Sequence, residues 1–339
     1  MKTKINRWLA GMLTAIMILS MIPVSTFAAE ADLTIGNYAE LLAFAESVNG
    51  GETYEGKTVR LDVNVELGGE TNLWVPIGTS GAPFSGTFDG NYHVVSGLYV
   101  NSDSNAGFFG YVKNGNIKNL VVRGNVTGKE NVGGIVGNVG GGDIVNCGNE
   151  ADVSGGRFIG GVAGYVSGTA SVDGCYNAAS VNASTGYIGG VVGTFWGTQT
   201  AKNCYNTGTV TGPATVGGVL GGHKAKSPTL ENCYNAGEIT NSGAAVNNHG
   251  SLIGAKGSIV NCYDLSDSSF PGVGTTGDAA DKVSELTASQ LGEAFVDGTP
   301  NPRLAWESSV SADAPSEPSF TESTELSARL AEYIKASVK

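Results

Sequence analysis

The sequence predicts an all-β protein, a right-handed parallel β-helix whose rungs of about 28 residues each hold three short strands, with an N-terminal helical cap. The first observation behind this prediction is a tandem repeat over residues 107–267. One cysteine marks each repeat, at intervals of 28, 29, 29 and 29 residues: Cys147, Cys175, Cys204, Cys233 and Cys262. A fixed period of this size indicates stacked structural units.

The second observation is a Gly-Gly phrase between aliphatic residues, which recurs out of phase with the cysteines at 132–135, 159–162, 188–191 and 216–219. The third is an aliphatic position that recurs later in each unit: Val126, Val153, Val181, Val210 and Ile239. Helical repeats of similar length need alanine and leucine at helical spacing and tolerate little glycine. Here β-branched residues fill the apolar positions, and 52 of 339 residues are glycine, so short strands joined by turns are favoured.

Residues 1–28 have the pattern of a secretory signal peptide. Lys2, Lys4 and Arg7 precede an apolar run over 9–22, and small residues allow cleavage after Ala28. The run is short for a membrane anchor. We therefore expect a secreted or extracellular protein, either free or associated with the cell surface, with no membrane insertion of the mature chain.

The chain is acidic, with a formal net charge of −12. Two basic and eleven acidic residues lie within 29–106, whereas the repeat block carries nine of each. Phosphate contacts need clustered lysine and arginine, so nucleic acid is not expected as a partner. The same charge argues against binding to anionic lipid surfaces.

Residues 29–106 are expected to form a cap and the first turns of the β-helix. A helix is predicted over 37–48, with Asn37 as N-cap and an apolar stripe of Tyr38, Leu41, Leu42, Ala45 and Val48. Alternating apolar residues over 57–67 then predict a half-buried strand. A solenoid leaves an open apolar end, and such a helix would cover it.

The cysteines are predicted to fill an interior column. Leu120 occupies the cysteine position of the first rung, 27 residues before Cys147. A position that accepts leucine or cysteine is apolar and buried. Neighbouring rungs would bring the cysteine Cα atoms within disulfide range. Stacked buried thiols are nevertheless favoured, because an odd number of cysteines, five, cannot all pair and one cysteine per rung needs no bridge. A metal site would need ligands close in sequence, such as Cys-x-x-Cys, and the sequence contains none, so neither a metal nor another cofactor is expected.

Two further columns follow each cysteine. One column lies two residues after each cysteine, and its stacked side chains are expected to form a hydrogen-bonded ladder and to stabilise the turns: Asn149, Asn177, Asn206, Asn235 and Asp264. The other column lies directly after the cysteine, where Gly148 in the earlier rung is followed by Tyr176, Tyr205, Tyr234 and Tyr263. An outward aromatic stack would bind sugar rings, but mutual stacking that covers a turn is favoured.

A polar column marks a solvated face: Thr127, Ser154, Asn182, Thr211 and Thr240. A longer loop at 247–249 lengthens the last unit, and such insertions are where binding differences tend to occur. The candidate binding residues are therefore Tyr176, Tyr205, Tyr234, Tyr263, Thr211, Thr240 and Asn247.

The repeats resemble those of GLUG-motif proteins. The resemblance rests on phrases such as 134–137 and 190–193, on the paired Asn-Cys-Tyr-Asn, on the lead-in at 74–91 and on the closing text at 291–306. GLUG repeats occur in large exported bacterial surface proteins, including adhesin-like proteins and the non-catalytic N-terminal part of IgA-specific metalloendopeptidases. The resemblance implies a β-helix at the bacterial surface and no particular ligand. The chain has no His-Glu-x-x-His, since its histidines are His93, His223 and His249.

No catalytic residues are predicted. Enzymes on parallel β-helices gather carboxylates on one face of several rungs, whereas the acidic residues of these repeats do not recur in register. We expect a non-enzymatic role in adhesion or recognition of an extracellular glycan or host surface protein. A polysaccharide lyase or glycoside hydrolase, or an inert structural spacer, are the alternatives.

The C-terminal part divides into a closing segment over 268–307 and a linker with a short helix over 308–339. A helix predicted within 282–295 is expected to cover the C-terminal end of the stack. A second amphipathic pattern over 326–338 predicts a helix without a core to dock on, which is marginal in isolation.

Overall fold

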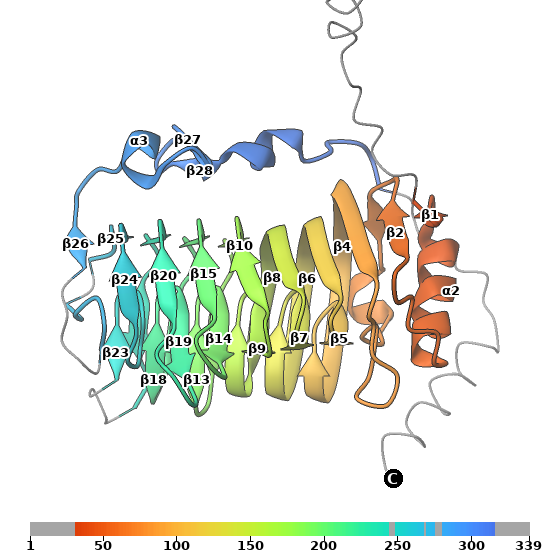
Figure 1. Ribbon diagram of the computed structural model, residues 1–339, viewed down its shortest axis with the longest axis horizontal. Helices are drawn as coiled ribbons and strands as arrows, with labels where there is room; N and C mark the ends of the chain where they lie inside the picture. Colours follow the sequence, from red (N-terminus) through yellow and green to blue (C-terminus); the bar gives the residue numbers. More distant parts are fainter. Residues whose placement is uncertain (1–30, 244–247, 268, 275–279, 316–339) are drawn as a thin grey trace, which may run out of the picture. The chain divides into compact units, whose positions relative to one another are not determined.

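The structure, a computed structural model, describes residues 31–243, 248–267, 269–274 and 280–315. The predicted signal peptide, Asn247 and the helix predicted over 326–338 lie outside these residues. From Leu33 onward the chain forms one compact unit. It is the predicted right-handed parallel β-helix, with about eight turns (Figure 1). No helix among the described residues is long and apolar enough to cross a membrane.

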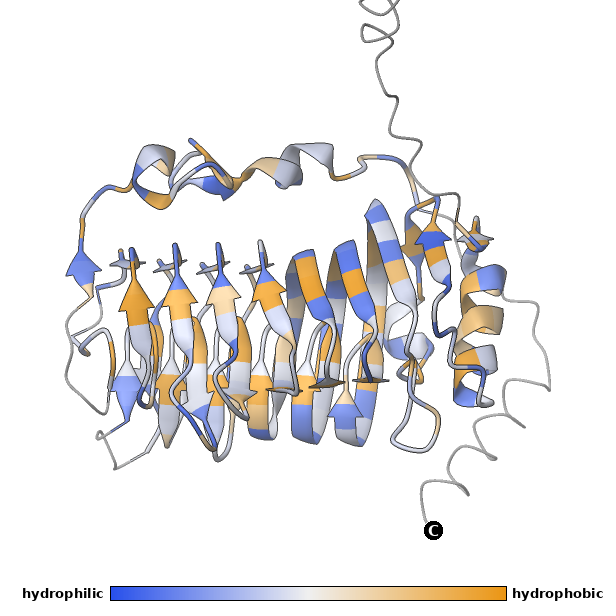
Figure 2. Ribbon diagram, in the orientation of Figure 1, coloured by the Kyte–Doolittle hydropathy of each residue, from blue (hydrophilic) through white to orange (hydrophobic). Residues whose placement is uncertain are grey.

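The predicted N-terminal helix is confirmed. It opens the fold together with β1 (Leu33–Ile35), and α2 (Tyr38–Asn49) begins where the Asn37 side chain accepts from the Glu40 backbone N–H at 3.0 Å. The helix buries one face, which includes Phe44 as well as most of the predicted stripe: Leu41, Phe44, Ala45 and Val48. Figure 2 shows this apolar face alongside the apolar bands of the first turns.

The strand predicted over 57–67 is interrupted. It consists of β2 (Thr58–Leu61) and β3 (Val65–Glu66), followed by the 3-10 turn η1 (Gly69–Thr71). Asn64, at the break, is buried, and its side-chain oxygen accepts from the Val94 backbone N–H at 2.8 Å. Apolar alternation could not reveal this buried amide, because its bonding partners lie elsewhere in the chain.

The repeats form two parallel sheets. In the early turns a single long strand bends through most of the rung: β4 (Thr87–Ala106), β6 (Asn116–Gly133) and β8 (Asp143–Gly160). In each of the next two turns the same path divides into four short strands. The first of these turns holds β10 (Ser171–Asp173), β11 (Tyr176–Asn177), β12 (Val181–Ala183) and β13 (Tyr187–Gly189). The second holds β15 (Thr200–Lys202), β16 (Tyr205–Asn206), β17 (Val210–Gly212) and β18 (Thr215–Gly217).

The later turns follow the same path, with β20 (Thr229–Glu231), β21 (Tyr234–Asn235), β22 (Ile239–Asn241), β23 (His249–Gly250), β24 (Ser258–Val260), β25 (Tyr263–Asp264) and β26 (Asp281–Lys282). The second sheet holds one strand per rung: β5 (Phe109–Val112), β7 (Val136–Gly140), β9 (Ala163–Ser167), β14 (Val192–Phe195) and β19 (Leu220–His223). A complete rung such as β10 to β14 therefore holds five short strands in two sheets, where the sequence predicted three strands.

The corners depend on asparagines that the sequence analysis did not single out. Left-handed backbone occurs at the residue just before the cysteine position: Asn119, Asn146, Asn203, Asn232 and Asn261. The asparagines after the tyrosines do not take this backbone conformation, but each ends a strand and supports the following turn, since Nδ2 of Asn177, Asn206 and Asn235 donates to the carbonyl two residues on. Asparagine tolerates the left-handed region better than most residues, which suits it to these corners.

The asparagines after the tyrosines form the predicted ladder. Asn149, Asn177 and Asn206 each donate from Nδ2 to Oδ1 of the next rung's asparagine, at 2.7, 2.7 and 2.8 Å. Each Nδ2 also donates to a backbone carbonyl two residues further on, as Asn206 does to Gly208 at 2.8 Å. The ladder explains the Gly-Gly phrase, since a Cβ on Gly190 would lie 2.4 Å from Cγ of Asn206.

The cysteines occupy the predicted interior column. Leu120 pairs in register with Cys147, and all five thiols are free and buried. Burial raises the pKa of the Cys175, Cys204 and Cys233 thiols well above the ordinary value. The column therefore packs the core as a stack of small apolar groups.

We expect these thiols to be inert in the folded protein. A thiolate is needed for reaction, and burial with a raised pKa removes both access and thiolate. Titration of the native chain with a disulfide reagent should detect fewer than about one thiol, whereas the denatured chain should show all five. Rapid labelling of several thiols without denaturant would contradict the buried column.

The C-terminal residues 286–313 form a strap, which does not cap the last rung as expected. The strap contains α3 (Ala288–Leu291), β27 (Phe295–Val296), β28 (Arg303–Leu304) and the 3-10 helix η2 (Ala305–Ser309). It runs back along the side of the β-helix towards the first turns (Figure 1). Trp306 Nε1 donates to the Gly174 carbonyl at 2.9 Å, and the Ser311 backbone N–H donates to the Tyr92 carbonyl at 2.9 Å.

Candidate functional site

The tyrosine column lies beneath the strap. The rings stack as one candidate interpretation predicted, with centroids 5.3 Å apart for Tyr176 and Tyr205 and 4.9 Å apart for Tyr205 and Tyr234. Trp306 stacks on Tyr176 at 5.7 Å and continues the column into the strap. The three tyrosines are 0–5% exposed, so they form no open platform for a sugar. That sugar-platform interpretation is wrong for these rings, because the tyrosines cover each other's faces, and Trp306 and Phe295 of the strap pack on Tyr176 and Tyr234.

Polar groups beneath the strap are bonded to one another. The Tyr205 hydroxyl donates to Glu307 Oε1 at 2.9 Å, and the Tyr176 hydroxyl donates to Glu150 Oε1 at 2.7 Å. Burial raises the pKa of Tyr205 and of Glu307. Tyr263 is half-buried, with its hydroxyl donating to Asn261 at 2.8 Å. These bonds hold the strap against the β-helix.

The polar column lies in register on a partly exposed face, as predicted. Thr211 pairs with Asn182 on one side and Thr240 on the other, and both threonines are half-exposed. Neither residue lines the groove described next, and Asn247 falls outside the described residues. The structure therefore does not bring the predicted binding residues together in one site.

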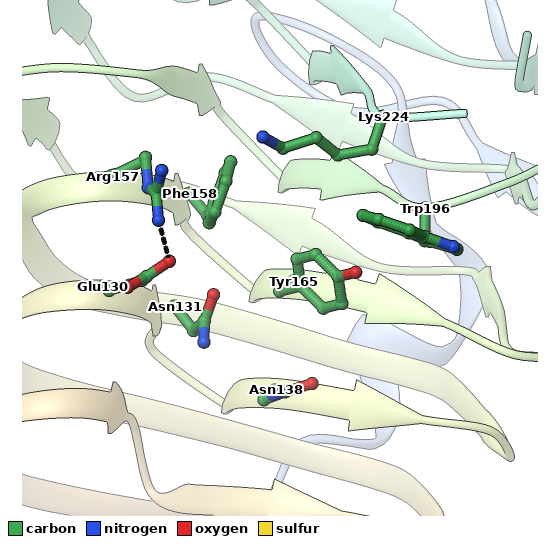
Figure 3. Close-up of a pocket in the computed structure, with 8 residues that line it drawn as sticks. All are labelled: Glu130, Asn131, Asn138, Arg157, Phe158, Tyr165, Trp196 and Lys224. Carbon is green, nitrogen blue, oxygen red and sulfur yellow. Dashed lines mark hydrogen bonds and ion pairs between the residues drawn. The ribbon is translucent and has the colours of Figure 1, made fainter. Parts of the chain in front are cut away.

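A groove of about 410 Å³ lies elsewhere on the repeat block, and we call it the aromatic groove (Figure 3). Its lining combines aromatic, amide and charged side chains: Glu130, Asn131, Asn138, Arg157, Phe158, Tyr165, Trp196 and Lys224. Ligand sites typically pair an apolar lining with a few polar groups in this way. The groove is thus the candidate functional site.

Three columns of the repeat build the groove. The first is the residue before the Gly-Gly phrase, occupied by Asn131, Phe158 and Tyr187 in successive rungs. The second lies on the short second sheet, where Asn138 on β7 pairs in register with Tyr165 on β9. The third follows that sheet and holds Trp196 and Lys224. Because rungs are about 4.8 Å apart, three steps along the stack give the groove a length of roughly 14 Å.

The aromatic rings of the groove contact one another. Phe158 lies with its centroid 5.8 Å from Tyr165 and 5.9 Å from Tyr187, and Tyr165 lies 6.2 Å from Trp196. Trp196 is 50% exposed, an unusual exposure for so large an apolar side chain. Burial raises the pKa of Tyr165, so its hydroxyl stays protonated and can donate. Trp196 and part of Tyr165 are accessible, whereas Phe158 is 4% exposed and supports them from below, with Arg157 and Lys224 against its ring.

Charged groups flank the rings. Arg157 pairs with Glu130, and its guanidinium lies 4.6 Å from the Phe158 centroid. Lys224 Nζ lies 4.7 Å from the same ring and 5.5 Å from that of Tyr187. Such distances are within the range of cation–π attraction, which holds both cations against the aromatic surface.

Phe158 has a left-handed backbone, with φ of 63°. The equivalent residue of the preceding rung is Asn131, at φ 56°. Asparagine adopts this conformation readily, whereas a bulky residue pays a conformational cost of order 1–3 kcal/mol. Tyr54 and Tyr92 take the same backbone conformation outside the groove, so the conformation describes the turn at Phe158 and not its role.

Sequence reasoning missed the groove because it followed the residues that recur. The groove residues are those that break the pattern: asparagine gives way to phenylalanine and tyrosine in the first column, and Trp196 stands among unlike residues in the third. Aligning the rungs and searching for aromatic substitutions in neighbouring units would have found it. Among the described residues, no group of three histidine, cysteine or acidic side chains could hold a metal ion.

Comparisons with known proteins support the fold. No family model matches the chain, and no curated protein matches it. A solved structure described as a "putative immunoglobulin A1 protease from Bacteroides ovatus" matches with a TM-score of 0.63, covering 80% of this chain and 92% of that chain at 21% sequence identity. At that identity the likeness concerns architecture alone. The chain therefore shares its β-helix over most of its length with a protein named as a protease of immunoglobulin A1, and no activity follows from this.

Proposed function

We propose that this chain is an exported carbohydrate-recognition protein that binds a glycan in the aromatic groove without chemically changing it. The single observation that supports this most is the half-exposed Trp196 beside the partly exposed Tyr165 in one open groove with two amide side chains. The C–H faces of a sugar ring pack on aromatic rings, while amides and hydroxyls exchange hydrogen bonds with its hydroxyl groups.

Export is proposed from the signal-peptide pattern of residues 1–28. A surface or secreted location would bring the groove into contact with extracellular glycans. The GLUG resemblance agrees with such a location. A role outside the cell is also compatible with five free thiols, because their burial protects them from oxidation.

Trp196→Ala and Tyr165→Ala should each weaken glycan binding by about 10- to 100-fold, as expected when an aromatic anchor is lost. A glycan array followed by calorimetry of the best-bound glycan measures this effect. Tyr99→Ala serves as the control, because Tyr99 is half-exposed and does not line the groove.

Three outcomes would contradict the proposal. Unchanged affinity of both groove variants would place binding elsewhere. Cleavage of an array glycan by the wild-type chain would favour the polysaccharide-cleaving alternative. Absence of any bound glycan would favour the spacer.

A further inference from the structure

We infer that the aromatic groove selects an anionic glycan, one whose sugar ring carries a carboxylate or sulfate group that pairs with Lys224. This inference rests on the proposed function and adds the class of ligand. Its basis is the charge of the groove, which differs from that of the chain. The chain has a formal net charge of −12, whereas the charged lining residues are one glutamate, one arginine and one lysine.

The lining charges are unequally partnered. Glu130 and Arg157 form an ion pair, so together they contribute little net charge. Within the described part of the chain, no carboxylate pairs with Lys224, and its ammonium lies over Phe158 and Tyr187. The groove thus contains one cation beside its ring surface that a ligand anion can neutralise.

The position of Lys224 directs its charge into the groove. Its backbone N–H donates to the Phe195 carbonyl at 2.9 Å, which anchors it directly beside Trp196 on the neighbouring rung. Figure 3 shows its side chain extending towards Phe158 and Arg157. A sugar stacked on Trp196 and Tyr165 would therefore have the Lys224 ammonium at its edge, where a ring substituent projects.

The groove is also electrostatically polarised along the stack. Lys226 and Lys256 are exposed, and burial, together with the charge of Lys256, lowers the pKa of His223, the residue before Lys224. Glu130 lies at the opposite end, three rungs earlier. An acidic glycan would therefore bind with its anionic group towards Lys224, because Glu130 and Arg157 already neutralise each other at the other end.

The test uses matched pairs of glycans that differ only in charge. We would compare oligogalacturonate with its methyl-esterified form, and a sulfated galactan oligosaccharide with its desulfated form, using the full chain. The wild type should bind the charged member of at least one pair about tenfold more tightly, and added salt should reduce this preference. The two pairs also distinguish a carboxylate from a sulfate ligand.

Lys224→Met should abolish the preference while retaining weak binding of the neutral form, because the aliphatic stem is kept and the charge is lost. Lys113→Met is the matched control. Lys113 occupies the same repeat position four rungs earlier. The residues before the two lysines, Val112 and His223, belong to one column of strand pairs that runs through Val139, Val166 and Phe195. This control should leave the preference unchanged.

Equal binding of charged and neutral forms, or a preference that survives Lys224→Met, would overturn the inference while the proposed function stands. Binding of no glycan, or binding that both Trp196→Ala and Tyr165→Ala leave intact, would overturn the proposed function and the inference together.

Discussion

Replacing Asn206 by alanine is expected to lower the free energy of unfolding by about 2–5 kcal/mol. Asn206 is fully buried in the middle of the ladder. Its loss would leave one of the two Asn177 Nδ2–H groups without its acceptor at 2.7 Å, while the other still bonds Ala179, and would leave the Gly208 carbonyl without its side-chain donor at 2.8 Å. Each unsatisfied buried polar group costs about 1–3 kcal/mol.

Asn182→Ala is the matched control for the ladder, because Asn182 is an exposed asparagine on a strand of the preceding rung. It should change the free energy of unfolding by less than about 0.5 kcal/mol. Urea denaturation followed by circular dichroism compares the two variants. If Asn206→Ala were as stable as Asn182→Ala, the ladder would be a consequence of the stacking and not a source of stability.

The repetitive part of this fold could be predicted from sequence because its determinants recur at one period. The equivalence of Leu120 and Cys147 placed the thiols inside, and the structure pairs these two residues in register. The amide ladder followed from the same logic. Each inference used positions that repeat, and stacked rungs convert sequence period into spatial neighbourhood.

The path of the strap could not be predicted in this way. Its bonds join residues far apart in sequence, such as Trp306 with Gly174 and Asn64 with Ser311. Nothing periodic links the two partners. The apolar pattern of the closing segment indicated that it packs on something, but the tyrosine column and the last rung were both apolar surfaces that it could have covered.

The aromatic groove falls between these two cases. Its residues occupy repeat positions, so their neighbourhood could be read from the alignment of rungs. Their chemistry departs from the repeat, however, and Phe158 even takes a backbone conformation suited to asparagine. A solenoid conserves the positions that hold rungs together and leaves other positions free to vary, which is where a binding surface can arise.

The strap gives the second large expected effect. Tyr234→Ala should lower the free energy of unfolding by about 3–5 kcal/mol, as for other large buried aromatic rings. Tyr234 is 0% exposed, and its ring stacks on Tyr205 at 4.9 Å and lies 6.1 Å from Phe295 of the strap. Its removal would open a cavity where the strap and the β-helix meet, and would also remove a hydrogen bond to the Pro302 carbonyl.

The same substitution should release the strap locally before the β-helix unfolds, because the rungs retain their own backbone ladders. Trypsin cleavage after Arg303, an exposed residue of β28, measures this release by mass spectrometry. Tyr234→Phe keeps the ring and loses only the hydroxyl, so it should cost about 1 kcal/mol and cleave nearly as slowly as the wild type. Unchanged cleavage at Arg303 in Tyr234→Ala would contradict this prediction. The contacts of η2 with the earlier rungs would then hold the strap without Tyr234, and the tyrosine stack would stabilise only the β-helix.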